Sequence, residues 1–140
     1  MKVNFKGVEK LQKKNKQRMK DFERDALRAT AKSALVVKAY AQDQIQRGTA
    51  TGRPRGDGSF ASAPGQFPKT DTGVLVSNIS TEVKQEGKTV VGKIISSAPY
   101  SKHLEFGTTN MAARPFMQPS LDRNADKIKA IFIREGIIDK

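Results

Sequence analysis

The sequence predicts an α+β fold with a long N-terminal helix, a small antiparallel sheet built on a central hairpin, and a C-terminal helix. Three observations support this prediction. No proline occurs before Pro54, residues 74–98 alternate and are rich in β-branched side chains, and a second helical stripe of apolar residues surrounds Pro119. A length of 140 residues is typical of one domain, so we expect residues 1–140 to form a single domain.

Residues 5–46 are predicted to form one long helix, because they are rich in Lys, Gln, Arg, Ala and Leu. At about 100° per residue, apolar side chains gather along one side of this helix, among them Val8, Leu11, Met19 and Phe22. The opposite side carries a basic face that consists of Lys6, Lys10, Lys13, Lys20, Arg24 and Arg28. A continuous helix would be about 60 Å long, which exceeds the width of such a domain. We therefore expect its N-terminal half to project and to pack on a neighbouring subunit.

The positive charge of the chain is concentrated in this helix. The formal net charge is +12, and residues 1–47 alone carry 13 basic and 5 acidic side chains. This concentration of positive charge favours an acidic partner: nucleic acid, an acidic protein ring or lipid. The basic face contains no aromatic side chain, so contact with packaged DNA would run through phosphates and would be independent of sequence. The alternative interpretation is a solvated helix face without a partner.

Residues 47–73 contain six Gly and three Pro, so they are predicted to form a flexible loop. Residues 74–135 are predicted to contain the rest of the fold. Its first part is a hairpin with strands at 74–83 and 89–98 and with Gly87 in the turn.

A short helical turn at 100–106 should follow the hairpin and end at Gly107. We expect Tyr100, Leu104 and Phe106 to hold this turn against the hairpin. Residues 108–118 are predicted to be irregular, and Pro119 suits the first turn of one final helix that ends near Gly136.

The sequence contains little that could support catalysis. It has no Cys, its single His is His103, and no two carboxylates have a spacing that suggests a catalytic pair. We expect no enzymatic activity, no catalytic residue, no cofactor and no metal site, with His103 a partly buried polar group in a helical turn. No apolar run of about 18 residues is present, and the N-terminus lacks the apolar stretch of a secretory signal, so no membrane partner is expected.

Residues 98–121, APYSKHLEFGTTNMAARPFMQPSL, resemble the signature of a family of small morphogenesis proteins of tailed bacteriophages. Residues 63–80, with a Pro-rich loop before a TG-x-L motif, are similar to the same family. The signature positions here are Tyr100, His103, Leu104, Glu105, Gly107, Thr108, Arg114, Pro115 and Phe116. These residues either build the fold or form a subunit interface. Arg114 could pair with Glu105 or bind exposed carbonyls, and Phe116 could fill the core or a neighbour's pocket.

The family is described as head–tail joining, neck or tail-completion proteins. The resemblance therefore implies a structural virion assembly protein that acts at the neck through protein contacts in a ring of identical subunits. It also implies a hexamer, and neighbours among the head-completion, tail-terminator or tail-tube proteins. The expected location is the virion neck or tail top, with the host cytoplasm during assembly. The alternative function is non-specific nucleic-acid binding by the basic N-terminal helix.

Overall fold

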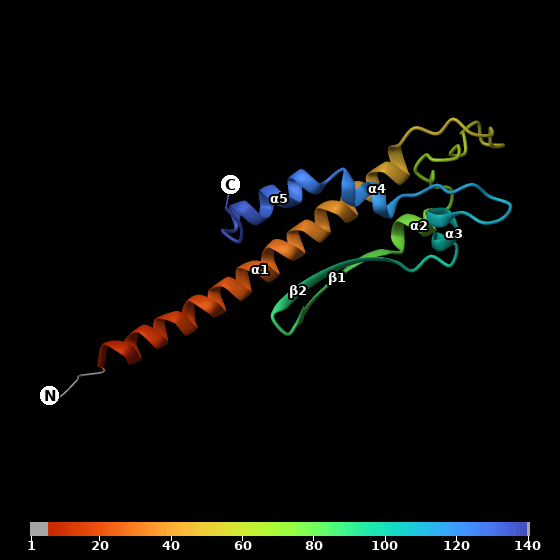
Figure 1. The fold of residues 1–140 in the computed structure, drawn as a ribbon. Helices are drawn as coiled ribbons and strands as arrows, with labels where there is room; N and C mark the ends of the chain where they lie inside the picture. The colour runs from red at the N-terminus through yellow and green to blue at the C-terminus, as the bar shows by residue number, and fades with distance from the viewer. Residues whose placement is uncertain (1–5, 140) are drawn as a thin grey trace.

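The computed structural model describes residues 6–139 and shows one long helix against which most of the other elements pack (Figure 1). The elements follow in the order α1 (Lys6–Arg47), α2 (Val74–Ser77), β1 (Ile79–Glu86), β2 (Thr89–Ser96), α3 (Ser101–Phe106), α4 (Met117–Asp122) and α5 (Ala125–Arg134). The predicted α+β class is confirmed. The side chain of Lys6, and residue 5 at the start of the predicted helix, lie outside the described residues.

Helix α1 has a covered C-terminal half and a projecting N-terminal half. The hairpin and α5 pack along its C-terminal half, whereas its N-terminus extends past every other element in Figure 1. From residue 7 onward, Ala29 is the first buried residue, and Val37, Ala41 and Ile45 follow on the covered side. A Cβ at Gly92 would lie 2.7 Å from Cγ2 of Thr30, so this glycine lets β2 approach α1 closely.

Strands β1 and β2 form an antiparallel hairpin whose register runs from the Ile79–Ser96 pair to the Glu86–Thr89 pair. The turn contains Gly87 with a φ of +63°, as the predicted hairpin requires. The first strand, however, begins five residues later than predicted.

Residues 74–77 form the short helix α2 instead of the start of that strand. Leu75 and Val76 are adjacent in the sequence, and both are buried in the core. An extended strand would direct two such neighbours to opposite faces, whereas a helical turn brings both against the core. Burial therefore overrides the strand preference of this β-branched segment.

The single C-terminal helix of the prediction is two helices, α4 and α5, and α4 already begins at Met117. Asn124 lies between them, almost fully buried, and its Nδ2 donates a hydrogen bond of 2.8 Å to the carbonyl of Ser120. An Asn side chain that binds nearby main chain competes with continued helix. Pro119 lies in the first turn of α4, as expected.

The hydrophobic core lies at the C-terminal end of α1, where α2, the start of β1 and α4 meet. Phe116 is fully buried there, among Ala41, Ile45, Leu75 and Ile79. The sequence left open whether Phe116 fills the core of its own subunit or a pocket of a neighbouring subunit. The structure places it in the core of its own subunit.

Residues 48–73 contain no helix or strand, yet hydrogen bonds fold them against the end of α1. The ammonium of Lys69 donates to the carbonyls of Gln46 and Gly48, at 2.6 and 3.0 Å. The guanidinium of Arg55 donates to the carbonyl of Thr70 at 3.0 Å. The mobility of this loop stays a prediction.

Candidate interaction surfaces

The carboxylate of Glu105 joins α3 to the start of α4. It accepts hydrogen bonds from the main-chain N–H groups of Phe116, Met117 and Gln118, at 2.8, 3.0 and 3.0 Å. These N–H groups have no partner within their own helix, and a negative charge at this end of a helix is favourable. Glu105 thus serves as a cap provided by another segment of the chain.

Arg114 ties α3 to the long loop. Its Nε donates a hydrogen bond of 3.1 Å to the carbonyl of Ser62, and its main-chain N–H donates one of 2.7 Å to the carbonyl of Leu104. Of the two roles left open for Arg114, binding a carbonyl is the one observed. Its partner Ser62 lies 52 positions away in a loop, and no local sequence pattern pointed to it.

Gly107 allows the sharp turn that follows α3. Its φ is +75°, and a Cβ there would lie 2.8 Å from the carbonyl oxygen of Met111. Thr108 and Met111 form an isolated bridge that closes the turn, and Thr108 itself is exposed. The signature glycine is therefore explained by the fold.

Several side chains of the signature segment, residues 98–121, are more exposed than the sequence suggested. Phe106 is 76% exposed and cannot hold α3 against the hairpin, whereas Leu104 is half-buried against the core. Tyr100 is 41% exposed. His103 was expected to be partly buried, but it is exposed. Helix α3 is only six residues long, and the side that carries His103 faces outward. Pro115 is half-buried beside Phe116.

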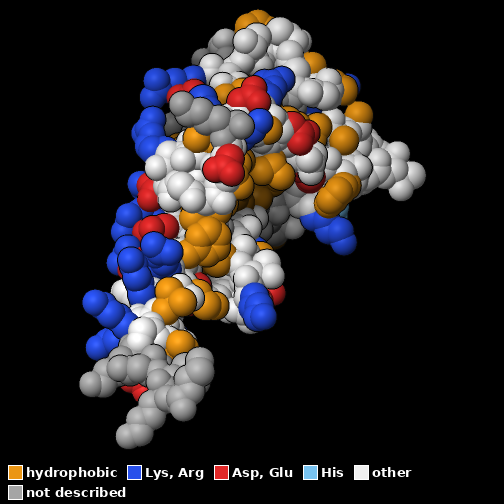
Figure 2. Space-filling view, turned by 60° about the vertical axis from the view of Figure 1, so that its left-hand side comes forward, with side chains coloured by type: hydrophobic (Ala, Val, Ile, Leu, Met, Phe, Trp, Pro, Cys, Tyr) orange, Lys and Arg blue, Asp and Glu red, His pale blue; other side chains and the backbone are white. Residues whose placement is uncertain are grey.

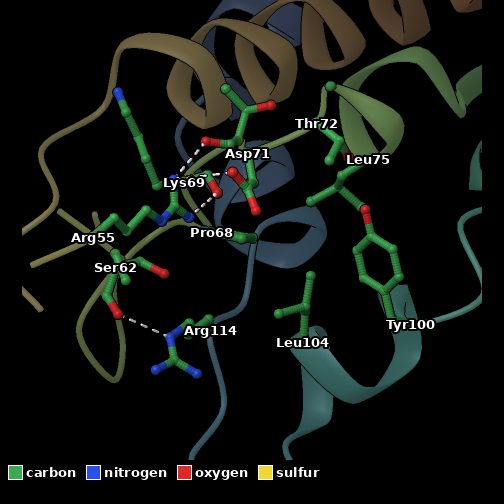
Figure 3. Close-up of a pocket in the computed structure, with 13 residues that line it drawn as sticks. Arg55, Ser62, Pro68, Lys69, Asp71, Thr72, Leu75, Tyr100, Leu104 and Arg114 are labelled. Carbon is green, nitrogen blue, oxygen red and sulfur yellow. Dashed lines mark hydrogen bonds and ion pairs between the residues drawn. The ribbon is translucent and has the colours of Figure 1, made fainter. Parts of the chain in front are cut away.

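A cavity of about 370 Å³, lined by both polar and apolar side chains, lies between the loop and α3 (Figure 3). Tyr100, Leu104 and Arg114 line one side, and Arg55 and Lys69 line the other. Arg55, Lys69 and Arg114 all donate to main-chain carbonyls, so these cations hold the loop in place.

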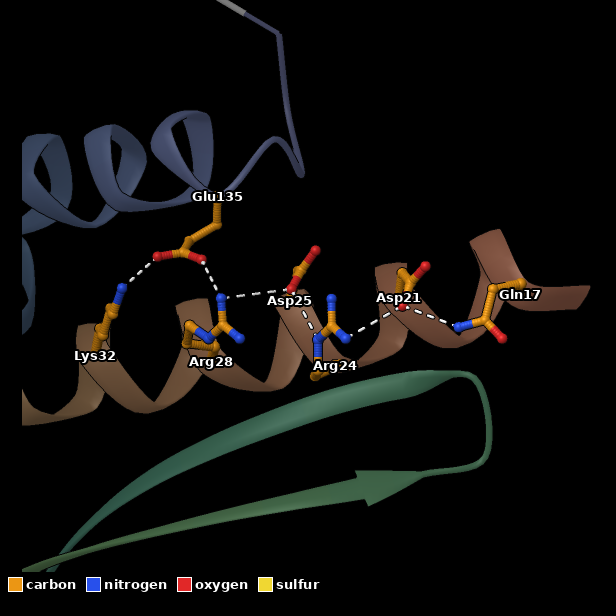
Figure 4. Close-up of polar contacts among 7 residues, drawn as sticks. All are labelled: Gln17, Asp21, Arg24, Asp25, Arg28, Lys32 and Glu135. Carbon is orange, nitrogen blue, oxygen red and sulfur yellow. Dashed lines mark hydrogen bonds and ion pairs between the residues drawn. The ribbon is translucent and has the colours of Figure 1, made fainter. Parts of the chain in front are cut away.

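The structure divides the basic face into two parts. Lys10, Lys13 and Lys20 are exposed and form no ion pair with another described residue. Arg24 and Arg28, in contrast, are paired within the chain, as Figure 4 shows.

The ion pairs of the two arginines continue from α1 to the end of α5. Arg24 lies 3.2 Å from a carboxylate oxygen of Asp21 and 3.3 Å from one of Asp25. Arg28 contacts Asp25 at 3.6 Å and Glu135 at 3.5 Å, and Lys32 also pairs with Glu135 (Figure 4). The hydrogen bond from Lys32 lowers the pKa of Glu135, and the charge of Arg28 adds to this effect. Glu135 was not foreseen, because it lies more than a hundred positions from both partners.

The apolar side chains of the projecting half of α1 are uncovered. Val8, Leu11, Met19 and Phe22, which we call the apolar ridge, are between 46% and 63% exposed. Figure 2 shows apolar side chains running along the molecule beside a border of Lys and Arg. The predicted separation of apolar and basic sides is thus present, but the side chains of the apolar ridge remain largely exposed in the described part of the chain.

Within residues 6–139, no three His, Cys, Asp or Glu side chains lie together as metal ligands would. Nor does that part of the chain contain a helix with the length and apolar character needed to cross a bilayer.

Comparison with known families identifies a relationship over most of these elements. A family model described as "Bacteriophage HK97-gp10, putative tail-component" matches residues 9–107. The match runs from the first turn of α1 through Gly107, and it confirms the resemblance to a phage morphogenesis family. Neither the curated proteins nor the solved structures contain a match to the chain. Since the matched residues make up well over half of the 140, the chain belongs to the HK97-gp10-like family of bacteriophage tail components.

Proposed function

We propose that this tail-component family member is a structural virion protein that acts at the phage neck. There it completes the tail or joins head to tail, as part of a ring of identical subunits. Its work is binding, with no bond made or broken. The neighbours in the particle are head-completion, tail-terminator or tail-tube proteins, and the subunits assemble in the host cytoplasm.

The observation that carries this proposal is the uncovered apolar ridge on a helix that the family model includes. Four large apolar side chains in water cost free energy unless another molecule covers them. A projecting helix with such a face is suited to packing on other proteins in a particle. The fold gives the ridge a rigid base, because the second half of α1 is anchored in the core.

Electron microscopy of particles tests the proposal directly. A phage or prophage that carries this gene would be compared with a deletion strain and with the same strain complemented by a tagged chain. We expect the deletion to yield separate heads and tails, and the tag to appear at the head–tail junction. Normal joined particles from the deletion strain, or a tag elsewhere in the particle, would refute a role at the neck.

The second candidate function, non-specific binding of nucleic acid, has one observation in its favour. Lys10, Lys13 and Lys20 form an exposed basic surface with no ion pair to the other described residues. Binding of the purified chain to duplexes of unrelated sequence, measured across a salt series, tests this function. Tight binding that weakens steeply with salt would favour it, whereas weak binding at every salt concentration would exclude it.

A further inference from the structure

Helix α5 is packed incompletely, even though it is strongly amphipathic. None of its residues is buried, and Ile128 and Phe132 on its apolar side are only half-buried. Leu121 at the end of α4 is 44% exposed. An apolar helix face that remains this open in a single subunit leaves room for another apolar surface.

The open side of α5 is hollowed. A cavity of about 180 Å³ lies between α1, β2 and α5, and one of about 370 Å³ lies along α4 and α5. Both are lined by Leu121, Ile128 and Phe132, so the two hollows adjoin. We call this combined surface the α5 groove, with Ile94 of β2 on one side and Val37 of α1 in its floor.

The apolar ridge lies on α1, the same helix whose later residues line the floor of the α5 groove. Val8 and Met19 are eleven residues apart, as are Leu11 and Phe22. Eleven residues make about three helical turns, so the two pairs share one face. Continued by the same step, this face reaches Thr30, which lines the groove.

This arrangement excludes one partner for the ridge. The ridge and the groove floor belong to one unbroken helix, Lys6–Arg47, and cannot meet within one molecule. A second copy of the chain, however, brings a groove to the ridge of the first.

The charges also permit contact between two copies. Residues 8–22, which carry the ridge, have six basic side chains and two acidic side chains. Residues 117–139, which form most of the groove, have four of each. The net positive charge of the chain opposes self-association. This repulsion is reduced when the strongly basic ridge segment of one copy meets the electrically neutral groove segment of another.

We propose that the apolar ridge of one copy packs into the α5 groove of a second copy. Because the ridge and the groove are different surfaces, the contact is heterologous, and each subunit can bind one neighbour through its ridge and another through its groove. Such a chain of subunits closes into a ring when the rotation between neighbours is a suitable fraction of a full turn. The inference rests on the ring of the proposed function and specifies which surfaces build it. The apolar side chains contribute most of the stabilisation, so the contact should persist at high salt, unlike contact with DNA or with an acidic partner.

Cross-linking with engineered cysteines tests the contact, and the chain offers a clean background because it has no native Cys. One tagged copy would carry Met19→Cys and a second, differently tagged copy Leu121→Cys, joined by a short bis-maleimide. The matched control replaces Met19→Cys with Lys13→Cys, on the opposite side of α1. Both pairs would be tested in concentrated protein and in particles from complementation, at about 0.5 M salt, where charge interactions are screened.

We expect a product between the two tags that is at least tenfold more abundant for the Met19 pair than for the Lys13 pair. Equal yields, or no product in both preparations, would overturn the contact. An oligomer that forms without the Met19–Leu121 product would overturn this inference and leave the proposed ring intact. A single copy of the chain per particle would instead refute the ring.

A double variant, Leu11→Asp with Phe22→Asp, separates the second copy from other partners. Both side chains are exposed, so we expect an unchanged melting temperature and at least a tenfold weaker self-association. The control, Lys13→Asp with Lys20→Asp, places the same new groups on the basic face and should self-associate normally. A ridge variant that self-associates normally but fails to join heads to tails would assign the ridge to a different protein and overturn the proposal.

Discussion

The carboxylate of Glu105 lies 2.8 Å from the main-chain nitrogen of Phe116, and through this hydrogen bond a helix without buried residues holds the largest fully buried side chain among residues 6–139. Helix α3 itself has no buried residue. Its contribution to the fold comes from Glu105, which caps α4, and from Leu104, which packs against the core. The signature segment is therefore explained first as a structural device.

Removal of the Glu105 carboxylate should destabilise the protein. Glu105→Ala leaves three N–H groups at the start of α4 without their acceptor, and loss of a helix cap costs about 1–2 kcal/mol. Urea unfolding of parent and variant measures the difference. Lys102→Ala, at an exposed position of the same helix, is the control and should unfold like the parent. Equal stability of the two variants would mean that the cap contributes nothing.

The two phenylalanines near this cap should respond differently to truncation. Phe116→Ala opens a cavity in the core and should cost about 3–5 kcal/mol, a large part of the stability of a protein of this size. Phe106→Ala removes a side chain that is 76% exposed and should change the free energy of unfolding little. Thermal and urea unfolding test both. A Phe116→Ala variant that melts like the parent would contradict its burial within the subunit.

Glu135 should make the attachment of α5 dependent on pH. Its pKa is lowered below the ordinary 4.5 by the hydrogen bond from Lys32, so the folded state favours the ionised carboxylate. That contribution to stability is present above about pH 4.5 and is lost as the pH falls through the lowered value. The melting temperature of Glu135→Gln should therefore lie below that of the parent at pH 7, and the difference should shrink as the pH falls below the ordinary value of 4.5.

The control for this experiment is Glu86→Gln, since Glu86 is an exposed carboxylate at the far end of the hairpin. This variant should follow the parent at both pH values. A difference between parent and Glu135→Gln that stays constant from pH 7 to pH 2 would show that the ion pairs are not its origin.

The helices and the hairpin could be predicted because their signals are local. A 42-residue helix without proline, a β-branched pair of strands around Gly87, and Gly107 after a helical turn each follow from neighbouring residues. The same reasoning failed at α2, where the burial of Leu75 and Val76 decides the conformation. It also failed at Asn124, whose bond to the main chain divides the C-terminal helix.

The candidate surfaces were predictable in part for the same reason. The apolar and basic sides of α1 follow from helical periodicity, but which charges remain unpaired does not. Glu135 neutralises part of the basic face from a position more than a hundred residues away, and the α5 groove exists only because three distant elements meet. The exposure of His103 likewise depends on which side of α3 faces the core.

Charge reversal on the open part of the basic face tests the role of this surface. Lys10, Lys13 and Lys20 are exposed and without ion pairs to other described residues, so the triple Glu variant should fold with nearly the parent's melting temperature. It should impair the joining of heads to tails or the retention of DNA, because it would repel an acidic ring or the phosphates. Lower ionic strength should enhance the defect, since screening is then weaker.

The matched control for the triple variant reverses three other exposed lysines, Lys88, Lys102 and Lys127, and changes the net charge by the same amount. Complementation of a phage that lacks the protein provides the assay, with particles counted at low and moderate salt. If the basic face contacts an acidic partner, only reversal on α1 reduces the yield of joined particles. Equal losses in both variants would attribute the defect to net charge, and full infectivity from the α1 variant would leave the face as a solvated surface.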